Sequence, residues 1–587
     1  MTSGTGATWR GHVIVCGLHD VGVRIVEQLR LAGEQVVVAD DEPDPRLLRL
    51  SEEFGAAHLA ASGRRAATLN DAGLAGAAAL ICAHDSDLEN LEIALLARRM
   101  RPDLRVVAQL ENEAVARAVA RVTGEDSVLD VAAIAAPSLA EACLDLDSRA
   151  VEIDAEQFRL QELVAPADGT LRSLYDDLAP VAVSPADGSP LQVCPGRDLA
   201  VRAGDRVVVV ARTAELVARG LVDEETEEAE RRRRRGPLLR RYLRGFVASS
   251  ETQLRWTLAL LLTVAVLSVV VLRFAFRTDD GRHPSVLDAA YFTTETLTTV
   301  GFGDYSFTDQ DAWLRAWAIA LMVVGATLVT VLYAMFTNLL VSRRIAQSYG
   351  RQLATRMSEH VVVLGLGSVG LRVVETLVAA GQPVVVLERD EDNRFLARAR
   401  ALKVPVVFGD ATVPASLDAV NLRRARAVAV LTSDDLTNIE AGLAVADLLG
   451  DRRADVPVVL RVFDRDLAET IDVGFGFEDV RSTAALAAPW FVGAAFGLDI
   501  LTTFYVDRQP MLVGRLTVGD TGGLRGSAMA DLSARIRVIA LRRRGAAGLE
   551  YPPRRDTRFA GGDEAYLVGP YEELLQVLRR DQVATTQ

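Results

Sequence analysis

Eight consecutive residues between two apolar runs combine hydroxyl, carbonyl and glycine chemistry in a pattern suited to a dehydrated cation. The segment reads Thr298-Thr299-Val300-Gly301-Phe302-Gly303-Asp304-Tyr305. Gly301 and Gly303 can adopt positive φ angles, so the carbonyls of neighbouring residues can face one axis. Rings of such carbonyls, with the Thr299 hydroxyl as the innermost ring, can replace the water shell of an ion. The pattern predicts an ion-selectivity filter made of Thr299, Val300, Gly301, Phe302 and Gly303.

The runs on either side of this segment predict an all-α membrane domain. Every residue from 257 to 272 is apolar, Thr or Ser, and 256–276 is long enough to cross a bilayer at about 1.5 Å per residue. Residues 312–341 give a second span, and the shorter run 285–297 predicts a pore helix that leads into a re-entrant loop. Gly325 lies in the middle of the second span. It is a candidate gating hinge, and close packing of a small residue is the alternative.

Arginines gather at the outer ends of the two spans, whereas the connection between the spans is largely acidic. The positive-inside rule therefore predicts a multi-pass protein of the plasma (inner) membrane with both termini cytoplasmic. The net charge of -14 argues against nucleic acid as a partner. The arginines are Arg231 to Arg235, Arg240, Arg241, Arg244, Arg343 and Arg344.

The segments before and after the spans repeat one another at a nearly constant offset of 348 residues. Each copy has an apolar strand, a glycine turn, an amphipathic helix and a second strand that ends in an acid, which predicts two α/β Rossmann-like domains. The second copy holds a full motif of Gly365, Gly367 and Gly370 followed by Glu388. Its glycines allow a pyrophosphate to approach the helix N-terminus, and the acid can bind ribose hydroxyls.

The first copy keeps Gly17, Gly22 and Asp40 but has His19 at the middle glycine. Because a side chain there crowds a phosphate, we expect this site to be altered. A surface role for His19 and a ligand role are equally open.

These motifs together resemble those of two-transmembrane potassium channels with tandem RCK domains, one before and one after the pore. Phe302 replaces the commoner tyrosine of the potassium-channel filter, and the resemblance extends upstream into Glu295, which argues against a plain glycine turn. In the second copy the RCK resemblance also rests on Asp410 and Asn438, and in the first on Asn90. The sheet-rich segments that follow each copy resemble the small α+β C-terminal lobes of RCK domains.

The resemblance implies K+ as the permeant ion and a contact between Glu295 and Asp304 behind the filter. One filter strand cannot surround an ion, so the pore is expected to be a homotetramer in the lipid bilayer, with eight RCK domains in a gating ring. RCK channels are gated by nucleotides or calcium. In one calcium-binding version, paired glutamates follow the fifth strand, where this chain has Arg461. The residues therefore favour NAD/NADH or ADP/ATP over Ca2+ as the ligand of the second copy. A calcium site elsewhere in the chain stays open. No residues are predicted as metal ligands.

The expected function is a ligand-gated potassium-selective channel and not an enzyme. The alternatives are a subunit of a potassium uptake transporter and a membrane-tethered dinucleotide-dependent oxidoreductase. The predicted domains are the first RCK N-lobe 1–145 and C-lobe 146–222, a charged linker 223–255, the pore domain 256–342 with filter 298–305, a linker 343–358, and the second RCK N-lobe 359–495 and C-lobe 496–587.

Overall fold

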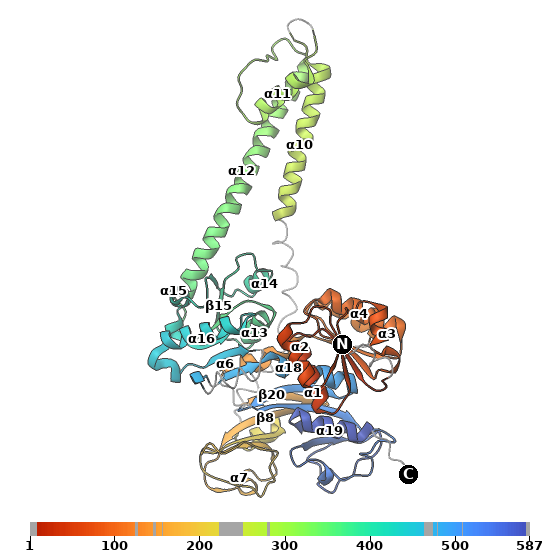
Figure 1. Ribbon diagram of the computed structural model, residues 1–587. Coiled ribbons are helices and arrows are strands. Elements are labelled where there is room, and N and C mark those ends of the chain that lie inside the picture. Colours follow the sequence, from red (N-terminus) through yellow and green to blue (C-terminus); the bar gives the residue numbers. More distant parts are fainter. Residues whose placement is uncertain are drawn as a thin grey trace. The chain divides into compact units, whose positions relative to one another are not determined.

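The computed structural model divides into two compact units (Figure 1). One comprises Met1–Ala229 and Leu353–Gln587, and the other comprises Glu230–Gln352. The structure describes residues 9–123, 127–144, 148–154, 156–221, 250–278, 282–462, 474–477, 479–507, 509–546 and 548–582. The arginine run of the predicted linker 223–255 lies outside these residues.

The first repeat is built on a six-stranded parallel sheet in the order β3-β2-β1-β4-β5-β6. Its central strands are short apolar runs buried on both faces, as expected where helices cover both sides of a parallel sheet. The strands are β1 (Val13–Cys16), β2 (Val36–Ala39), β3 (Ala57–Leu59), β4 (Ala79–Cys82), β5 (Arg105–Gln109) and β6 (Val128–Leu129). The helices are α1 (Asp20–Leu31), α2 (Pro45–Glu53), α3 (Ala66–Asp71), η1 (Leu74–Gly76), α4 (Asp87–Met100) and α5 (Glu113–Thr123).

The second repeat has the same sheet order, β16-β15-β14-β17-β18-β19. The predicted duplication of a Rossmann-like domain is therefore confirmed. Its strands are β14 (His360–Leu364), β15 (Val384–Glu388), β16 (Val406–Phe408), β17 (Ala425–Val430), β18 (Val458–Val462) and β19 (Asp479–Ser482). Its helices are α13 (Ser368–Ala379), α14 (Leu396–Ala401), α15 (Pro414–Ala419), η4 (Leu422–Arg424), α16 (Asp435–Leu449) and η5 (Gly450–Ala454).

A five-stranded antiparallel sheet follows each repeat and forms a smaller lobe. The first lobe contains β7 (Ser148–Ile153), β8 (Glu156–Val164), β9 (Gly169–Thr170), α7 (Leu171–Tyr175), β10 (Ala179–Ser184), β11 (Gln192–Val193), β12 (Ala200–Val201), β13 (Arg206–Arg212) and α8 (Thr213–Ala218). The second contains β20 (Asp499–Val506), β21 (Gln509–Thr517), η6 (Met529–Asp531), β22 (Arg537–Arg542), β23 (Leu549–Glu550), β24 (Glu564–Gly569) and α19 (Tyr571–Gln582).

Two apolar helices are exchanged between the repeats. Helix α6 (Val131–Leu144) ends the first sheet but packs on α13, and α18 (Thr483–Phe496) ends the second sheet but packs on α1 (Figure 1). Their alanine-rich sequences have no broad polar face, so most of the surface of each helix is buried. Phe491 of α18 is fully buried in a core that also contains Ile25 and Leu29 of the first repeat. Neither repeat therefore completes its own core.

The other unit contains α10 (Ser250–Ala275), α11 (Val286–Leu297) and α12 (Ala312–Ala354). A reciprocal capping box between Ser285 and Asp288 starts α11, as its sequence favours. Two segments, Trp256–Ala275 and Ala312–Ala334, are long and apolar enough to cross a membrane. The predicted span 312–341 lies within α12. The helix extends to Ala354 through most of the predicted linker 343–358, because residues 342–354 contain no proline that would stop it.

We expect Phe491→Ala to lower the thermal unfolding temperature of the purified chain, since removal of a fully buried phenylalanine costs about 3 to 5 kcal/mol. Phe475→Ala is the matched control, because the Phe475 side chain is exposed. Equal unfolding temperatures of the two variants would contradict the role of α18 in the shared core.

Candidate functional site

The loop that follows α11 has the backbone conformation expected of its glycines. Gly301 and Gly303 have φ angles of +59° and +83°. Thr299 has a φ of +60°, an uncommon value for a β-branched residue. Val300 and Phe302 are exposed on the single chain. The loop backbone thus has positive φ angles at alternate residues, while the side chains of Val300 and Phe302 stay uncovered by the described part of one chain.

Glu295 supports this loop through a contact that differs from the predicted one. Its Oε1 accepts a hydrogen bond from the Gly303 amide at 3.2 Å, and its side chain is buried. Asp304 instead accepts a hydrogen bond from the Tyr291 hydroxyl at 3.1 Å. These two contacts stand in place of the predicted one between Glu295 and Asp304, and Glu295 Oε2 is buried without a hydrogen-bond partner among the described residues. Tyr291 was missed, although it lies one helical turn before Glu295.

Gly325 makes a close contact in the interior of α12. A Cβ added there would lie 2.6 Å from Cδ2 of Leu297, the last residue of α11. The structure thus shows the close packing that was the alternative to a hinge. Bending at Gly325 stays a prediction.

In the glycine turn of the second repeat, the first and third glycines are tightly packed, whereas the middle glycine faces open space. A Cβ at Gly365 would lie 3.0 Å from the Thr432 amide nitrogen, and one at Gly370 would lie 2.2 Å from the Gly365 carbonyl oxygen. A Cβ at Gly367 would meet nothing within 4 Å. The outer glycines therefore serve the packing of the turn, and space is left in front of Gly367 at the start of α13.

Glu388 closes the same turn from the end of β15. Its Oε2 accepts a hydrogen bond from the Leu366 amide at 2.6 Å, and its Oε1 accepts one from the Asp390 amide at 2.9 Å. Each oxygen keeps a further lone pair for another donor. Asp410 follows β16 at the same edge of the sheet, where the amide and the hydroxyl of Thr412 hold its pKa below the usual range.

The first repeat reproduces the turn geometry. Asp40 accepts hydrogen bonds from the Leu18 amide at 2.7 Å and the Glu42 amide at 3.0 Å. A Cβ at Gly22 would lie 2.2 Å from the Gly17 carbonyl oxygen, the same distance as in the second repeat. The main difference is His19, which caps the start of α1 at the position of the open Gly367.

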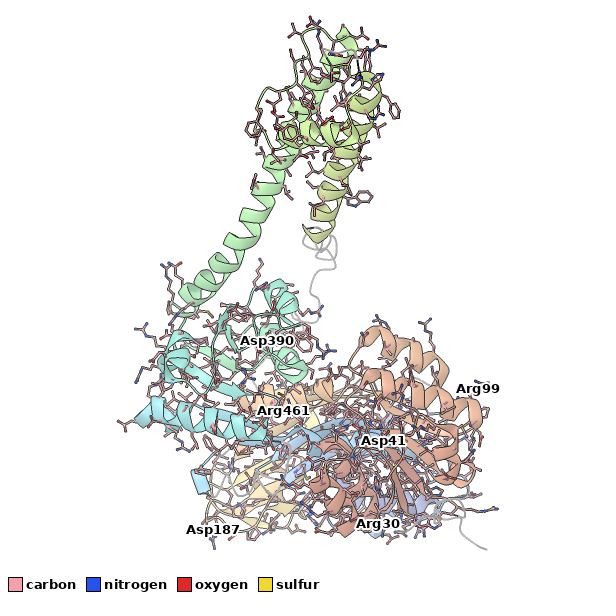
Figure 2. The ribbon with its side chains drawn as sticks, turned by 45° about the horizontal axis from the view of Figure 1, so that its top comes forward. Arg30, Asp41, Arg99, Asp187, Asp390 and Arg461 are labelled. Carbon is pink, nitrogen blue, oxygen red and sulfur yellow. The ribbon has the colours of Figure 1, made fainter. Side chains whose placement is uncertain are left out.

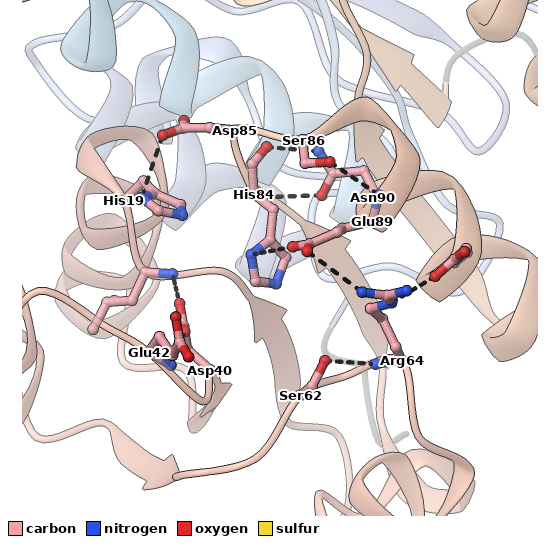
Figure 3. A network of polar contacts seen from close by, with 12 residues as sticks. His19, Asp40, Glu42, Ser62, Arg64, His84, Asp85, Ser86, Glu89 and Asn90 are labelled. Carbon is pink, nitrogen blue, oxygen red and sulfur yellow. Dashed lines mark hydrogen bonds and ion pairs between the residues drawn. The ribbon is translucent and has the colours of Figure 1, made fainter.

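A second histidine, which sequence reasoning missed, faces His19 (Figure 3). His84 follows β4, and its amide donates to Asn90 Oδ1 at 2.9 Å, as the amide of Thr432 donates to Asn438 at 2.8 Å. The two imidazole rings lie 5.9 Å apart in an edge-to-face arrangement. Burial lowers the pKa of His84, which favours the neutral ring. The offset of 348 residues could have identified His84, because it replaces Thr432.

Donor atoms of His19, Asp40 and His84 all lie within 4.8 Å of one another, close enough to hold a metal ion. The expectation that the chain has no metal site is thereby open to revision.

The position that argued against calcium carries a partly buried cation. Arg461, labelled in Figure 2, lies on β18, and burial lowers its pKa to about 10. Carboxylates of both repeats oppose this shift, and Asp435 and Asp20 make the largest contributions. The guanidinium thus carries the positive charge at this position. The neighbouring Phe463 and Asp464 lie outside the described residues.

Comparison with known proteins assigns the domains. Residues 13–130 and 361–482 match the TrkA-N domain, and residues 259–342 match an ion-channel domain. The chain is 26% identical over 186 residues to the voltage-gated potassium channel Kch of Escherichia coli, covering 31% of this chain and 43% of Kch. It is 23% identical over 197 residues to the probable potassium channel protein 2 of Methanocaldococcus jannaschii, covering 32% of this chain and 56% of that protein. The chain thus spans about half the length of these curated relatives.

The solved structure of the GsuK channel has the same fold over most of the chain. Its TM-score is 0.51 at 16% identity, with 98% of this chain and 80% of that chain covered. The expected order of domains, one repeat on each side of a channel domain, is confirmed.

Proposed function

Because this chain is a membrane protein with one ion-channel domain between two TrkA-N domains, we propose that it forms a potassium-selective channel gated by a cytoplasmic ligand. The observation that carries the proposal is the loop 298–305. Its glycines have positive φ angles, Glu295 holds the Gly303 amide from behind, and helices of membrane-spanning length lie on both sides. Carbonyls arranged in this way replace the hydration shell of K+.

The pore is a homotetramer in this proposal. A single loop offers oxygens from one side only, and exposed Val300 and Phe302 require neighbours that the described part of one chain does not supply. Four chains bring eight TrkA-N domains, which form a gating ring on the cytoplasmic side. The arginines outside the spans support cytoplasmic termini. A ligand opens or closes such a pore only by its differential affinity for the two states.

The ligand proposed for the second repeat is an adenine nucleotide or a nicotinamide dinucleotide. The space before Gly367 admits a pyrophosphate to the amides at the start of α13. Glu388 already holds the turn, and its free lone pairs accept hydrogen bonds from ribose hydroxyls. Arg461 supports a nucleotide over calcium, because it places a positive charge where the calcium-binding version has glutamates.

The proposed activity is tested with the purified chain in liposomes. We expect a potassium flux that excludes sodium and needs no turnover of nicotinamide. Turnover of the cofactor without flux would favour the oxidoreductase. Flux that appears only with a second protein would favour the subunit of an uptake transporter.

We expect Gly303→Ala to abolish potassium selectivity while the tetramer persists. A Cβ at a φ of +83° costs about 1 kcal/mol or more in each of four subunits, and it turns the adjacent carbonyl away from the axis. The measurement is the ratio of potassium to sodium flux in liposomes, with light scattering for the oligomeric state. Gly188→Ala is the control, because Gly188 also has a positive φ in open space, but in the first C-lobe. Unchanged selectivity in Gly303→Ala would refute the filter assignment.

We expect Glu295→Val to impair potassium flux and Glu295→Gln to preserve most of it. Valine leaves the Gly303 amide without its acceptor, which costs about 1 to 3 kcal/mol, whereas the glutamine carbonyl keeps the acceptor. Flux and its decay over time are compared in liposomes. Equal behaviour of the valine variant and the wild type would show that Glu295 does not stabilise the loop.

We expect Gly367→His to abolish nucleotide binding to the full chain, because it copies the first repeat's side chain into the open space of the second. The fold should persist, since a Cβ at Gly367 meets nothing and its φ is -79°. Glu388→Ala should weaken binding by roughly thirtyfold, through loss of a charge-assisted hydrogen bond of about 2 kcal/mol. Calorimetric titration with NADH and with ADP measures both. Asp40→Ala is the matched control in the first repeat, and stronger loss there than in Glu388→Ala would reverse the assignment.

A further inference from the structure

The cleft at the glycine turn differs between the repeats at four facing positions at once. The first repeat has His19, His84, Asp85 and Glu89 where the second has Gly367, Thr432, Ser433 and Thr437. The backbone around these positions is the same in both, down to the asparagine that caps the turn after the fourth strand. These four residue differences therefore change the chemistry of the cleft and leave the fold unchanged.

Each of the two histidines has a carboxylate beside its Nδ1 atom. His19 Nδ1 lies 3.4 Å from Asp85 Oδ2, and His84 Nδ1 lies 3.4 Å from Glu89 Oε2 (Figure 3). A carboxylate on one ring nitrogen orients the imidazole and makes the other nitrogen a better metal ligand. This pairing leaves the two Nε2 atoms as donors.

The Nε2 atom of His84 is buried without a hydrogen-bond partner among the residues that the structure describes. Only 7% of the His84 side chain is exposed, so water does not readily satisfy this nitrogen. An unpaired buried polar atom costs about 1 to 3 kcal/mol unless a ligand takes it up. Asp40, buried on the opposite side of the cleft, supplies a carboxylate oxygen to the same group of atoms.

The histidines that serve the fold behave differently. His12 and its counterpart His360 are fully buried, and each uses Nε2 for a hydrogen bond to a carbonyl, of Ala72 at 2.8 Å and of Val420 at 2.9 Å. They occur in both repeats and have no carboxylate partner among the ion pairs of the described residues. Their Nδ1 atoms are also buried without a hydrogen-bond partner among the described residues, so the difference lies in the carboxylates beside His19 and His84. His19 and His84 have no histidine counterpart in the second repeat.

We propose that the first repeat binds a divalent transition-metal ion of the zinc class through Nε2 of His19, Nε2 of His84 and the carboxylate of Asp40. Two imidazoles with one carboxylate suit such an ion, whereas Ca2+ and Mg2+ take oxygen ligands. Ligands of a tetrahedral centre with bonds of about 2.0 Å lie about 3.3 Å apart. The His19 side chain is 41% exposed and can rotate, which lets its donor atom move closer to those of Asp40 and His84 from the present spacing of up to 4.8 Å.

The charges around the cleft support a cation in the first repeat. Asp40, Glu89 and Asp41 all act on His84. Arg64 neutralises part of this charge, since its Nη1 lies 3.5 Å from the far oxygen of Glu89. The ion takes the place that the open Gly367 offers to a phosphate in the second repeat, so each repeat responds to a different ligand. The proposal does not depend on potassium conduction.

The test is calorimetric titration of the chelator-treated full chain with Zn2+. We expect one ion per chain in the wild type. His19→Gly and His84→Thr install the residues that the second repeat carries. Loss of a carboxylate that only orients a metal ligand weakens metal binding by about tenfold to hundredfold. We expect each histidine variant to weaken binding by more than that. Asp85→Ser should produce that smaller loss. His283→Ala, in the other unit, should bind like the wild type.

Co2+ supplies a second readout. Its visible absorption reports nitrogen and oxygen ligands directly, and we expect the bands to vanish in His84→Thr. Thermal unfolding without metal checks that each variant is folded. If His84→Thr is unstable, His19→Gly still decides, because His19 is half-exposed. The proposal fails if the wild type binds no Zn2+, or if His19→Gly and folded His84→Thr bind as tightly as the wild type.

Discussion

The exchange of α6 and α18 is the contact on which the rest of the cytoplasmic unit depends. Each helix is mostly apolar, so it is stable only with most of its surface in a core, and that core includes the other repeat. Burial of Phe491 and its neighbours makes the two sheets one folded unit, although the channel domain separates them by more than two hundred residues in the chain. The glycine turns of both repeats are therefore parts of one folded unit. This is the physical basis on which two sites can share one response.

Ion pairs also join the two repeats. Arg372 pairs with Asp130 at 3.0 Å and Arg394 with Glu111 at 3.0 Å, and both bonds join the second repeat to the first. Arg461 lies among carboxylates of both repeats, and two of these, Asp20 and Asp85, flank His19 and His84 in sequence. A cation at the proposed metal site would repel Arg461 and attract the carboxylates that now face it. The electrostatics of the interface and of the cleft are therefore linked.

The sequence predicted the large features because each depends on a local pattern. Apolar runs gave the spans, and the constant offset of 348 residues gave the repeated Rossmann-like sheet. The partner of Glu295 was wrong, since the contact was carried over from a resemblance, whereas the loop offers the nearer Gly303 amide. The continuation of α12 beyond the predicted span was missed, because hydropathy marks where a membrane span ends, not where a helix does. The exchanged helices and the pairing of His19 with His84 were missed, because each joins residues that are distant in the chain.

The comparison of the repeats separates residues that serve the fold from residues that serve a ligand. Asp40 and Glu388 both hold a backbone amide of the glycine turn, so both repeats use an acid at this position for the fold. The acid is for that reason weak evidence of an occupied site. Gly367 is stronger evidence, because the fold does not need it: its φ is ordinary and its surroundings are open. The same reasoning applies to His19 and His84, which the second repeat folds without. Residues that one repeat holds and the other does not are where the two ligand specificities must lie.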